Sequence, residues 1–324
     1  MRVFVAGASG AIGTRLVPQL IESGHEVIGT ARSPANVERL RALGAEPLVL
    51  DLLDPRAVGR AVREAEPDAV VHQATALADV RFSRNLDRAF EQTNRLRRQG
   101  TDALLAAAHE AGVRRFVAQS FANFRYARVG GPVKRENDPL DPAPVPGMRL
   151  TAAAMTYLDE AVLAAGGVVL RYGSFYGADT DGLIEPVRKR RFPIVGSGDG
   201  VSSFVHLDDA AAATVLALEH DGPALYHVVD DEPAPVREWL PVLAAALGAK
   251  PPRRYPIRLA RLFAGEGAVM MGTTARGADN EKAKRELGWA PRHPSWRGGF
   301  AAAYARTEVA ATGAGAAAVQ GSGA

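Results

Sequence analysis

Short apolar runs of strand length recur along the first half of the chain, separated by longer alanine-rich or amphipathic segments. Runs of this kind indicate buried strands, and the segments between them have the length and periodicity of helices. Strands that alternate with helices predict an α/β fold with a parallel, doubly wound sheet. The expected strands cover residues 3–6, 26–30, 47–50, 69–72, 116–119 and 168–171.

The alternation loosens after about residue 174, where Gly- and Pro-rich connections predominate. We interpret residues 1–173 as the sheet domain and residues 174–311 as a smaller, substrate-binding lobe interleaved with that core. Residues 312–324 are almost all Ala, Gly, Ser and Val without periodicity, which predicts a disordered tail. The elements expected in the lobe are a helix over 208–219, a strand over 225–229 and a helix after Pro235.

A proline-rich stretch, residues 121–150, interrupts the pattern between the fifth and sixth expected strands. It contains Gly130-Gly131 and five prolines. Loops of that length inside a compact domain are usually functional or mobile, so we expect this one to border a substrate site.

Glycines at three-residue spacing follow the first expected strand and open a helix-like run. Glycine in such a turn permits close approach of the backbone to a pyrophosphate, and the helix N-terminus supplies N–H donors. The context predicts a Rossmann-type dinucleotide site, although a glycine-rich turn without a ligand is the structural alternative. The expected contacts are Gly7, Ser9, Gly10, Ala11, Ile12 and Gly13.

The segment at the end of the second expected strand, Gly29-Thr-Ala-Arg-Ser33, bears on the choice of dinucleotide. An acid at that place hydrogen-bonds the ribose of NAD, whereas this chain has Arg32. The charge and forked shape of a guanidinium suit a 2′-phosphate, so NADP(H) is favoured over NAD(H). The alternative is that Arg32 is a solvated loop residue.

Several segments, in this order, resemble the extended short-chain dehydrogenase/reductase family, within the NAD-dependent epimerase/dehydratase group, over residues 1 to about 300. The segments are Asp51-Leu52, Val71-His-Gln-Ala-Thr75, Thr93-Asn94, Phe116-Val-Ala-Gln-Ser120, Leu170-Arg-Tyr-Gly-Ser-Phe-Tyr-Gly177 and Ser203-Phe-Val-His-Leu-Asp-Asp209. The resemblance implies further cofactor contacts from Asp51, Leu52, Gln73, Ala74, Thr75, Asn94, Ser120, Tyr172, Gly173 and Ser174. It also implies homodimers formed through long helices near residues 83–112 and 150–165.

The family's acid–base pair is missing from the sequence. In the family a tyrosine, with a lysine one helical turn later, transfers the proton of the carbinol oxygen as hydride moves. None of the seven tyrosines here has a lysine four residues later. One alignment puts Ala152 and Thr156 at the two positions, and other registers give Pro146 with Leu150 or Met148 with Ala152.

Two residues are candidates for a catalytic role in the absence of that pair. Ser120 ends an expected strand, where α/β sheets bind ligands, and could hydrogen-bond a substrate carbonyl. Tyr126, in the loop, and Tyr157, on the helix that lost the pair, each offer a phenol, although ordinary packing explains a half-buried tyrosine equally well. The expected substrate contacts are Phe121, Phe124, Tyr176 and His206.

Composition excludes several other kinds of function. The chain has no cysteine, so disulfides and Zn–Cys sites are excluded, and no histidine spacing suggests a metal site. The net charge of +3 comes from scattered residues apart from residues 188–191, so we expect no nucleic-acid partner. No leader pattern or long apolar run is present, so we expect a cytoplasmic protein without a membrane partner.

Together these features predict an NADPH-dependent ketoreductase that acts on a small-molecule ketone without a Tyr–Lys pair. General acid–base assistance contributes typically about 10²–10⁴-fold, so a substrate with its own phenol, such as an aromatic polyketide, could compensate for its loss. A non-catalytic NADP(H)-binding sensor or partner-binding module is the alternative from another class. A sugar-nucleotide epimerase or dehydratase is a further alternative, disfavoured because those reactions need the absent base.

Overall fold

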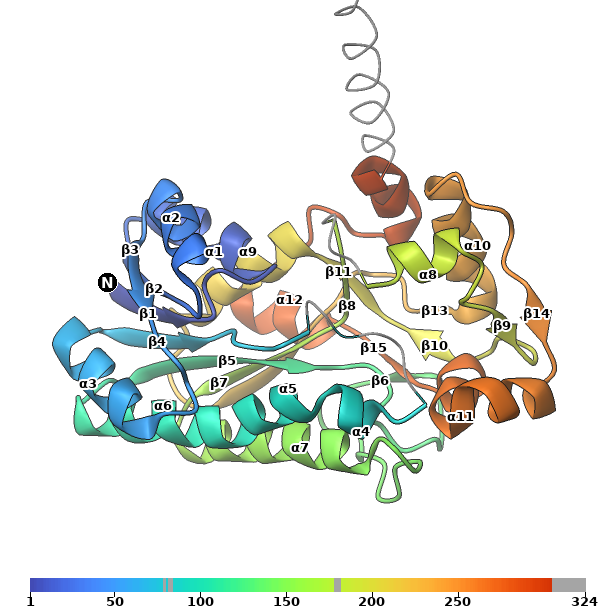
Figure 1. Cartoon of the computed structure of the whole chain (residues 1–324), viewed down its shortest axis with the longest axis horizontal. Coiled ribbons are helices and arrows are strands. Elements are labelled where there is room, and N and C mark those ends of the chain that lie inside the picture. The colour runs from blue at the N-terminus through green and yellow to red at the C-terminus, as the bar shows by residue number, and fades with distance from the viewer. Residues whose placement is uncertain (78–79, 81–83, 178–181, 305–324) are drawn as a thin grey trace, which may run out of the picture.

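A seven-stranded parallel sheet forms the centre of the computed structural model, which describes residues 1–77, 80, 84–177 and 182–304 (Figure 1). The spatial order is β12-β7-β5-β4-β1-β2-β3, which is a doubly wound α/β arrangement. The predicted fold class and all six predicted strands are therefore confirmed. The strands are β1 (Arg2–Ala6), β2 (Glu26–Ala31), β3 (Glu46–Val49), β4 (Ala69–His72), β5 (Arg115–Phe121), β7 (Val168–Tyr172) and β12 (Ala224–Val228). The expected tail, 312–324, lies outside the described residues.

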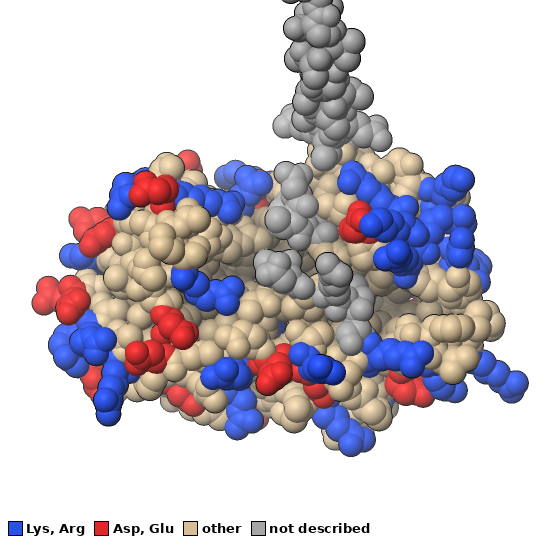
Figure 2. Space-filling view, in the orientation of Figure 1, with Lys and Arg blue, Asp and Glu red and all other residues tan. Residues whose placement is uncertain are grey.

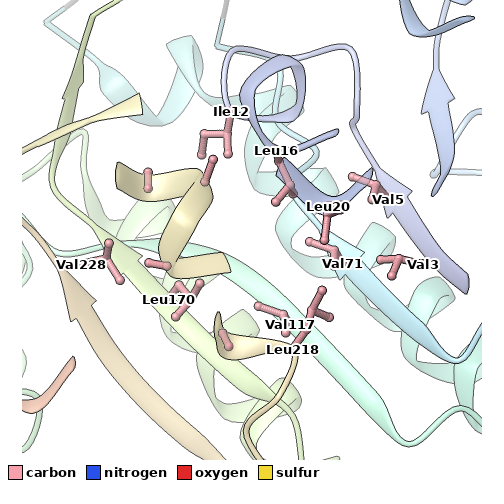
Figure 3. Packing of buried hydrophobic residues seen from close by; sticks show 14 of the residues in the cluster. Val3, Val5, Ile12, Leu16, Leu20, Val71, Val117, Leu170, Leu218 and Val228 are labelled. Carbon is pink, nitrogen blue, oxygen red and sulfur yellow. The ribbon is translucent and has the colours of Figure 1, made fainter. Parts of the chain in front are cut away.

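Helices cover both faces of the sheet because its strands are apolar on both sides. One face carries α1 (Gly13–Glu22), α2 (Pro34–Ala42), α9 (Leu207–Ala217) and α12 (Glu281–Leu287). The other face carries α3 (Pro55–Ala65), α6 (Thr101–Glu110) and α7 (Arg149–Ala164) (Figure 1). Figure 3 shows how the first face packs: Leu16 and Leu20 of α1 lie over Val3 and Val71 of the strands.

The chain after residue 174 contributes to both parts of the molecule. The expected strand near 225–229 is β12, which pairs with β7 at the edge of the main sheet, and the expected helix near 208–219 is α9, which packs on α1. The helix after Pro235 is α10 (Val236–Ala246), in the smaller lobe. The two kinds of element alternate along the sequence, so the lobe is interleaved with the core.

The smaller lobe is built from short strand pairs and helices around an aromatic core. Phe204, Trp239, Trp296 and Phe300 are buried there with ring centroids 5.2–6.4 Å apart. Its helices are α8 (Ile184–Arg188), α10 and α11 (Ile257–Thr273). Its strands pair as β8 (Ser174–Tyr176) with β11 (Phe204–His206), β9 (Ile194–Val195) with β14 (Arg254–Tyr255), and β10 (Val201–Ser202) with β13 (Ala234–Pro235); β6 (Val133–Lys134) pairs with β15 (Gly277–Ala278).

A π-helix interrupts the helical segment that leads into α6. The chain passes from α4 (Leu86–Ala89) and α5 (Glu91–Arg95) through the π-helical turn Leu96–Gly100 into Thr101. A π-helical turn shifts the residues that follow it around the helix axis, and such turns are frequent at functional sites. Arg97, inside this turn, is buried against α7 as a result. None of the described helices is long and apolar enough to span a bilayer.

His72 at the end of β4 makes folding sensitive to acid. The ring is 1% exposed and its Nδ1 accepts the backbone N–H of Ala74 at 3.4 Å. Burial lowers the pKa of His72 to about 4. The unfolded chain binds the proton more readily than the folded protein does. The contribution of the neutral ring to the free energy of unfolding is therefore fully present above the unfolded pKa of His72, and it is lost as the pH falls below that value toward the folded pKa.

We predict that His72→Asn, whose side-chain oxygen can accept the same N–H, loses less stability on acidification than the wild type. Between pH 7 and pH 5 the wild type should lose about 2 kcal/mol more than this variant, from the difference between the folded and unfolded pKa values. Urea unfolding at the two pH values measures the effect. His109→Gln on the exposed end of α6 should keep the wild-type pH dependence; equal pH dependence in all three proteins would contradict the prediction.

Candidate functional site

The glycine turn between β1 and α1 lies at the carboxyl edge of the sheet and is shaped by steric constraints. Gly7 has φ +85°, and a Cβ there would lie 2.6 Å from Ala74 Cα. A Cβ on Gly13 would lie 2.2 Å from the carbonyl oxygen of Ala8, so only glycine lets α1 approach the turn this closely. Gly10 is exposed, and its nearest neighbour would be the Gly7 oxygen at 3.2 Å. The fold thus requires Gly7 and Gly13, while Gly10 keeps the outer side of the turn open to a ligand.

The other expected cofactor residues of the first three strands lie at the same edge. Thr30, the penultimate residue of β2, accepts the Gly7 N–H at 3.0 Å and fixes the turn to its neighbour strand. Arg32 follows β2 and is exposed, and within the described ranges its guanidinium forms no ion pair. Asp51 follows β3, is exposed, and accepts the Leu53 N–H at 3.0 Å. These placements fit a dinucleotide that runs from the glycine turn across the ends of β2 and β3.

Gln73, directly after β4, and Tyr172, the last residue of β7, form a buried polar pair at this edge. Gln73 Nε2 donates to the hydroxyl of Tyr172 at 3.3 Å, and that hydroxyl also bonds Thr214 at 2.6 Å. Gln73 Oε1 is buried and has no hydrogen-bond partner among the described residues. Tyr172 is fully buried, and burial raises its pKa to about 12. The expected cofactor contact of Tyr172 therefore cannot involve its side chain, which belongs to the core.

The remaining expected cofactor residues have structural partners too. Asn94 is buried and donates to Thr151 Oγ1 of α7 at 3.0 Å. A Cβ on Gly173 would lie 2.7 Å from the Ser203 oxygen, and Ser174 Oγ accepts from Asn123 at 3.1 Å. Gly173 and Ser174 directly follow the end of β7. Ala74 and Thr75 continue from Gln73 past the glycine turn, consistent with the expected path of the cofactor.

Ser120 is held by an arginine that sequence reasoning missed. The hydroxyl of Ser120 accepts from Arg125 Nη1 at 3.1 Å, and both residues are buried. The preceding residue, Phe124, has φ +48°, which is strained for a bulky side chain and turns the loop back toward β5. This turn places the Arg125 guanidinium beneath the carboxyl end of the strand.

Arg125 belongs to a buried ionic network around one carboxylate. Asp159 Oδ2 on α7 lies 2.8 Å from Arg125 Nη2 and 2.7 Å from Arg171 Nη2 of β7, and Arg171 Nε donates to it at 2.8 Å. Each of the three side chains is at most 6% exposed. The sequence held a signal for this network, because a charged residue interrupts otherwise apolar positions at two places. Arg171 lies within the apolar strand 168–172, and Asp159 lies on the buried face of α7.

Tyr126 is part of the same network, which corrects its expected role. Its hydroxyl accepts from Arg171 Nη1 at 2.7 Å and makes a short hydrogen bond with His227 Nε2. The residue is 2% exposed, and burial raises its pKa. Its hydroxyl is engaged by Arg171 and His227, and Tyr126 does not border the hollow at Ala152, so it is not placed to meet a substrate there. Tyr157 does not replace it, since it points outward and donates to Asp102 at 2.6 Å.

A small hollow lies at Ala152, one of the positions aligned with the family's tyrosine. Thr151 borders it on the same helix, and Arg125 and Phe124 border it from the loop. Met148, Met155 and Met270 supply much of its apolar wall. Asp141 also borders it and is paired with Arg128 at 3.1 Å. The register with Leu150 is not supported, because that side chain is 66% exposed.

Two expected substrate residues, Tyr176 and His206, belong to the packing of the lobe. Tyr176 is 1% exposed and packs edge-on against Phe300. His206 Nδ1 accepts the Asp208 N–H and caps α9, and its ring stacks on His293 with centroids 3.8 Å apart. Neither borders the hollow at Ala152, so their expected substrate contacts are not supported there. Phe124 does border it, and Phe121 packs against Phe124 at 5.0 Å between centroids.

Two groups of histidines and carboxylates lie close enough to hold a metal, but hydrogen bonds within the protein explain them. They are His206, Asp209 and His293, and Glu136, His227 and Asp279. Asp209 accepts the N–H groups of Arg292 and His293 at 2.8 and 2.9 Å, and Glu136 accepts the His227 N–H at 2.9 Å.

Basic side chains gather over α8 and α10 on the face shown in Figure 2. The run 188–191 contributes to them. Lys189 pairs with Glu185, and Arg190 Nε donates to the Pro251 oxygen at 3.1 Å. Because these two residues have partners within the protein, we interpret the run as part of a solvated surface and not as a ligand site.

Known reductases resemble this chain over nearly its whole length. A 3-diazoavenalumate denitrifying reductase of Streptomyces sp is 46% identical over 93% of this chain and 99% of its own. A 4-hydroxy-2-methyl-3-oxo-4-farnesyl-3,4-dihydroquinoline-1-oxide ketoreductase of Stigmatella aurantiaca is 30% identical over 90% and 92%. The chain is thus related to reductases of small molecules.

Solved structures agree with the fold and the cofactor. The UDP-glucose 4-epimerase of Thermus thermophilus in complex with NAD superposes with a TM-score of 0.70, at 26% identity over 94% of this chain and 98% of its own. The model of the NAD dependent epimerase/dehydratase family matches residues 3–228. The glycine turn, the open sheet edge and these similarities together show that the chain belongs to the NAD dependent epimerase/dehydratase family and is an oxidoreductase with a nicotinamide dinucleotide cofactor.

Proposed function

We propose that this protein uses NADPH to remove the diazo group from a small aromatic acid by direct hydride transfer. The observation that carries the proposal is the hollow at Ala152: where the family has its acid–base tyrosine, this chain presents Arg125, Thr151, apolar side chains and Asp141, whose carboxylate is paired with Arg128. Neither a guanidinium nor an alcohol is a proton donor of the kind that ketone reduction uses. The 46% identity to a reductase that acts on a diazo compound supports this choice of substrate.

The chemistry of a diazo group explains why the pair is dispensable. Hydride from the reduced nicotinamide forms an N–H bond at the terminal nitrogen of an aryl diazonium group, which gives an aryl diazene. The diazene then loses N₂ as its C–N bond breaks, and one hydrogen remains on the ring carbon. The balance is one hydride in and one N₂ out, whereas a ketone also consumes a proton. The role of this chain is then to bind and orient the ring, and the apolar wall from Met148, Met155 and Met270 suits that task.

Reduction of a ketone is the second candidate, because two relatives at 30% and 31% identity are named as reductases of oxo compounds. An aromatic polyketide whose carbonyl is hydrogen-bonded to its own phenol could accept hydride without a protein acid. Thr151 is the hydroxyl at the hollow that could bond such a carbonyl.

We predict that the purified protein oxidises NADPH in the presence of 3-diazo-4-hydroxybenzoate, with one N₂ released and one 4-hydroxybenzoate formed per NADPH. Absorbance of the cofactor and gas analysis measure the two quantities. The matched probe is 2′-hydroxyacetophenone, a phenolic ketone. Oxidation with the ketone alone would favour the second candidate, and oxidation with neither probe would overturn the assignment of both substrates.

We infer a preference for NADP(H) from the exposed guanidinium of Arg32 at the end of β2. A charge-assisted hydrogen bond contributes about 1.5–3 kcal/mol, so Arg32→Ala should weaken NADPH binding by about 10- to 100-fold. NADH binding should remain within about twofold, because its ribose lacks the phosphate. Fluorescence titration with both nucleotides measures this. Arg39→Ala, an exposed arginine on α2, is the control, and equal loss of both nucleotides would refute the role of Arg32.

Gly10→Val should weaken both nucleotides by at least about tenfold, since the side chain would occupy the open side of the turn where the pyrophosphate approaches. The melting temperature should stay close to that of the wild type, because Gly10 is exposed. Gly59→Val on α3, where a Cβ meets nothing within 4 Å, is the matched control for titration and melting. Unchanged affinity in Gly10→Val would contradict the placement of the phosphates.

A further inference from the structure

The buried network behind the hollow carries more positive than negative charge. Arg97, Arg125 and Arg171 are buried; Asp159 forms ion pairs with Arg125 and Arg171, and Arg97 feels the charge of Arg125 and Asp159 without an ion pair to that carboxylate. Burial lowers the pKa of Arg97 to about 10, and the nearby charge of Arg125 lowers it further than Asp159 restores. A buried cation is costly unless an anion compensates it, so the surplus calls for a further negative group.

The other charged groups around the network do not supply that compensation. Glu136 accepts the His227 N–H at 2.9 Å, burial raises its pKa, and among the described residues no ion pair joins it to the three arginines. Burial and the charges of Arg171 and Arg125 lower the pKa of His227 well below its usual range, so the ring stays neutral. Asp141 borders the hollow, but its carboxylate is already paired with Arg128.

Arg125 connects the surplus charge to the hollow. It both contacts Asp159 and borders the space beside Ala152. Its side chain is 2% exposed, and its Nε is buried without a hydrogen-bond partner among the described residues. The bond from Nη1 to Ser120 holds the guanidinium in place, so a donor is already oriented before a ligand arrives.

We propose that the hollow at Ala152 is an anion-binding subsite, in which Arg125 binds an anionic oxygen of the substrate, either a carboxylate or a phenolate. The inference rests on the proposed function and adds how the substrate is recognised. The small side chain of Ala152 borders this space and leaves it open to the anion. Arg125 then acts by binding and orienting the substrate; the proton chemistry of the family's tyrosine has no counterpart.

The test measures equilibrium binding to the NADP⁺-loaded protein by calorimetry, so it does not depend on turnover. One arm compares 4-methoxybenzoate with 4-methoxybenzamide, and the other compares 4-nitrophenolate with 4-nitroanisole at mildly alkaline pH. We expect at least one anion to bind ten or more times more tightly than its neutral partner. The arm that shows the preference identifies the source of the anionic oxygen. Equal affinities in both arms would overturn the inference.

Two variants locate the subsite. Arg125→Met should reduce the affinity for the preferred anion to that of its neutral partner while NADP⁺ affinity stays within twofold. Ala152→Phe should abolish binding of the anion by filling the hollow. Because this variant retains Arg125 and its ion pair, it tests the subsite even if Arg125→Met fails to fold. Ala153→Phe, one residue further on the exposed face of α7, is the control. Wild-type anion affinity in Ala152→Phe or Arg125→Met would overturn the inference.

The outcome is separable from that of the proposed function. If diazo reduction is absent but anion-selective binding is lost in both variants, the subsite stands and the reaction is wrong. If diazo reduction occurs while charged and neutral probes bind alike, the reaction stands and the subsite is wrong.

Discussion

The side chain of Asp159 ties together the elements that border the active edge. Its carboxylate receives Arg125 from the loop and Arg171 from β7, and it stands on α7, the helix that presents Ala152. Removing one partner of a buried charge pair typically costs about 3–5 kcal/mol, because the other charge is left uncompensated. The position of α7 against the sheet, the path of the loop and the orientation of the guanidinium thus depend on one carboxylate.

Under the proposed function, the buried arginines take the place of the family's acid–base pair and recognise the substrate by charge. In open α/β sheets ligands bind outside the carboxyl ends of the strands, and the hollow at Ala152 of α7 borders Arg125, which bonds Ser120 near the end of β5. Here the same face of α7 offers a methyl group and leaves space in front of Arg125. A substrate that needs hydride but no proton can be served by such a site.

The sequence predicted the fold well because its signals are local. The apolar runs that became β1 to β5 and β7, and the glycines at 7, 10 and 13, depend on neighbours in the chain. The identity of Arg125, Asp159 and Arg171 as one network could not be predicted, because it depends on contacts between residues up to 34 apart in number, from Arg125 to Asp159. Tyr126 and Tyr176 were misplaced for the same reason: an aromatic side chain near a site is equally at home in the core, and only burial distinguishes the two.

The central claim is that hydride reaches the substrate directly and that no protein proton donor takes part in the slow step. A single-turnover measurement with NADPH deuterated at C4, in H₂O and in D₂O, tests it with 3-diazo-4-hydroxybenzoate as the substrate. The account predicts that deuterium on the cofactor slows oxidation and that D₂O leaves its rate unchanged. A rate that falls in D₂O but ignores deuterium on the cofactor would contradict it.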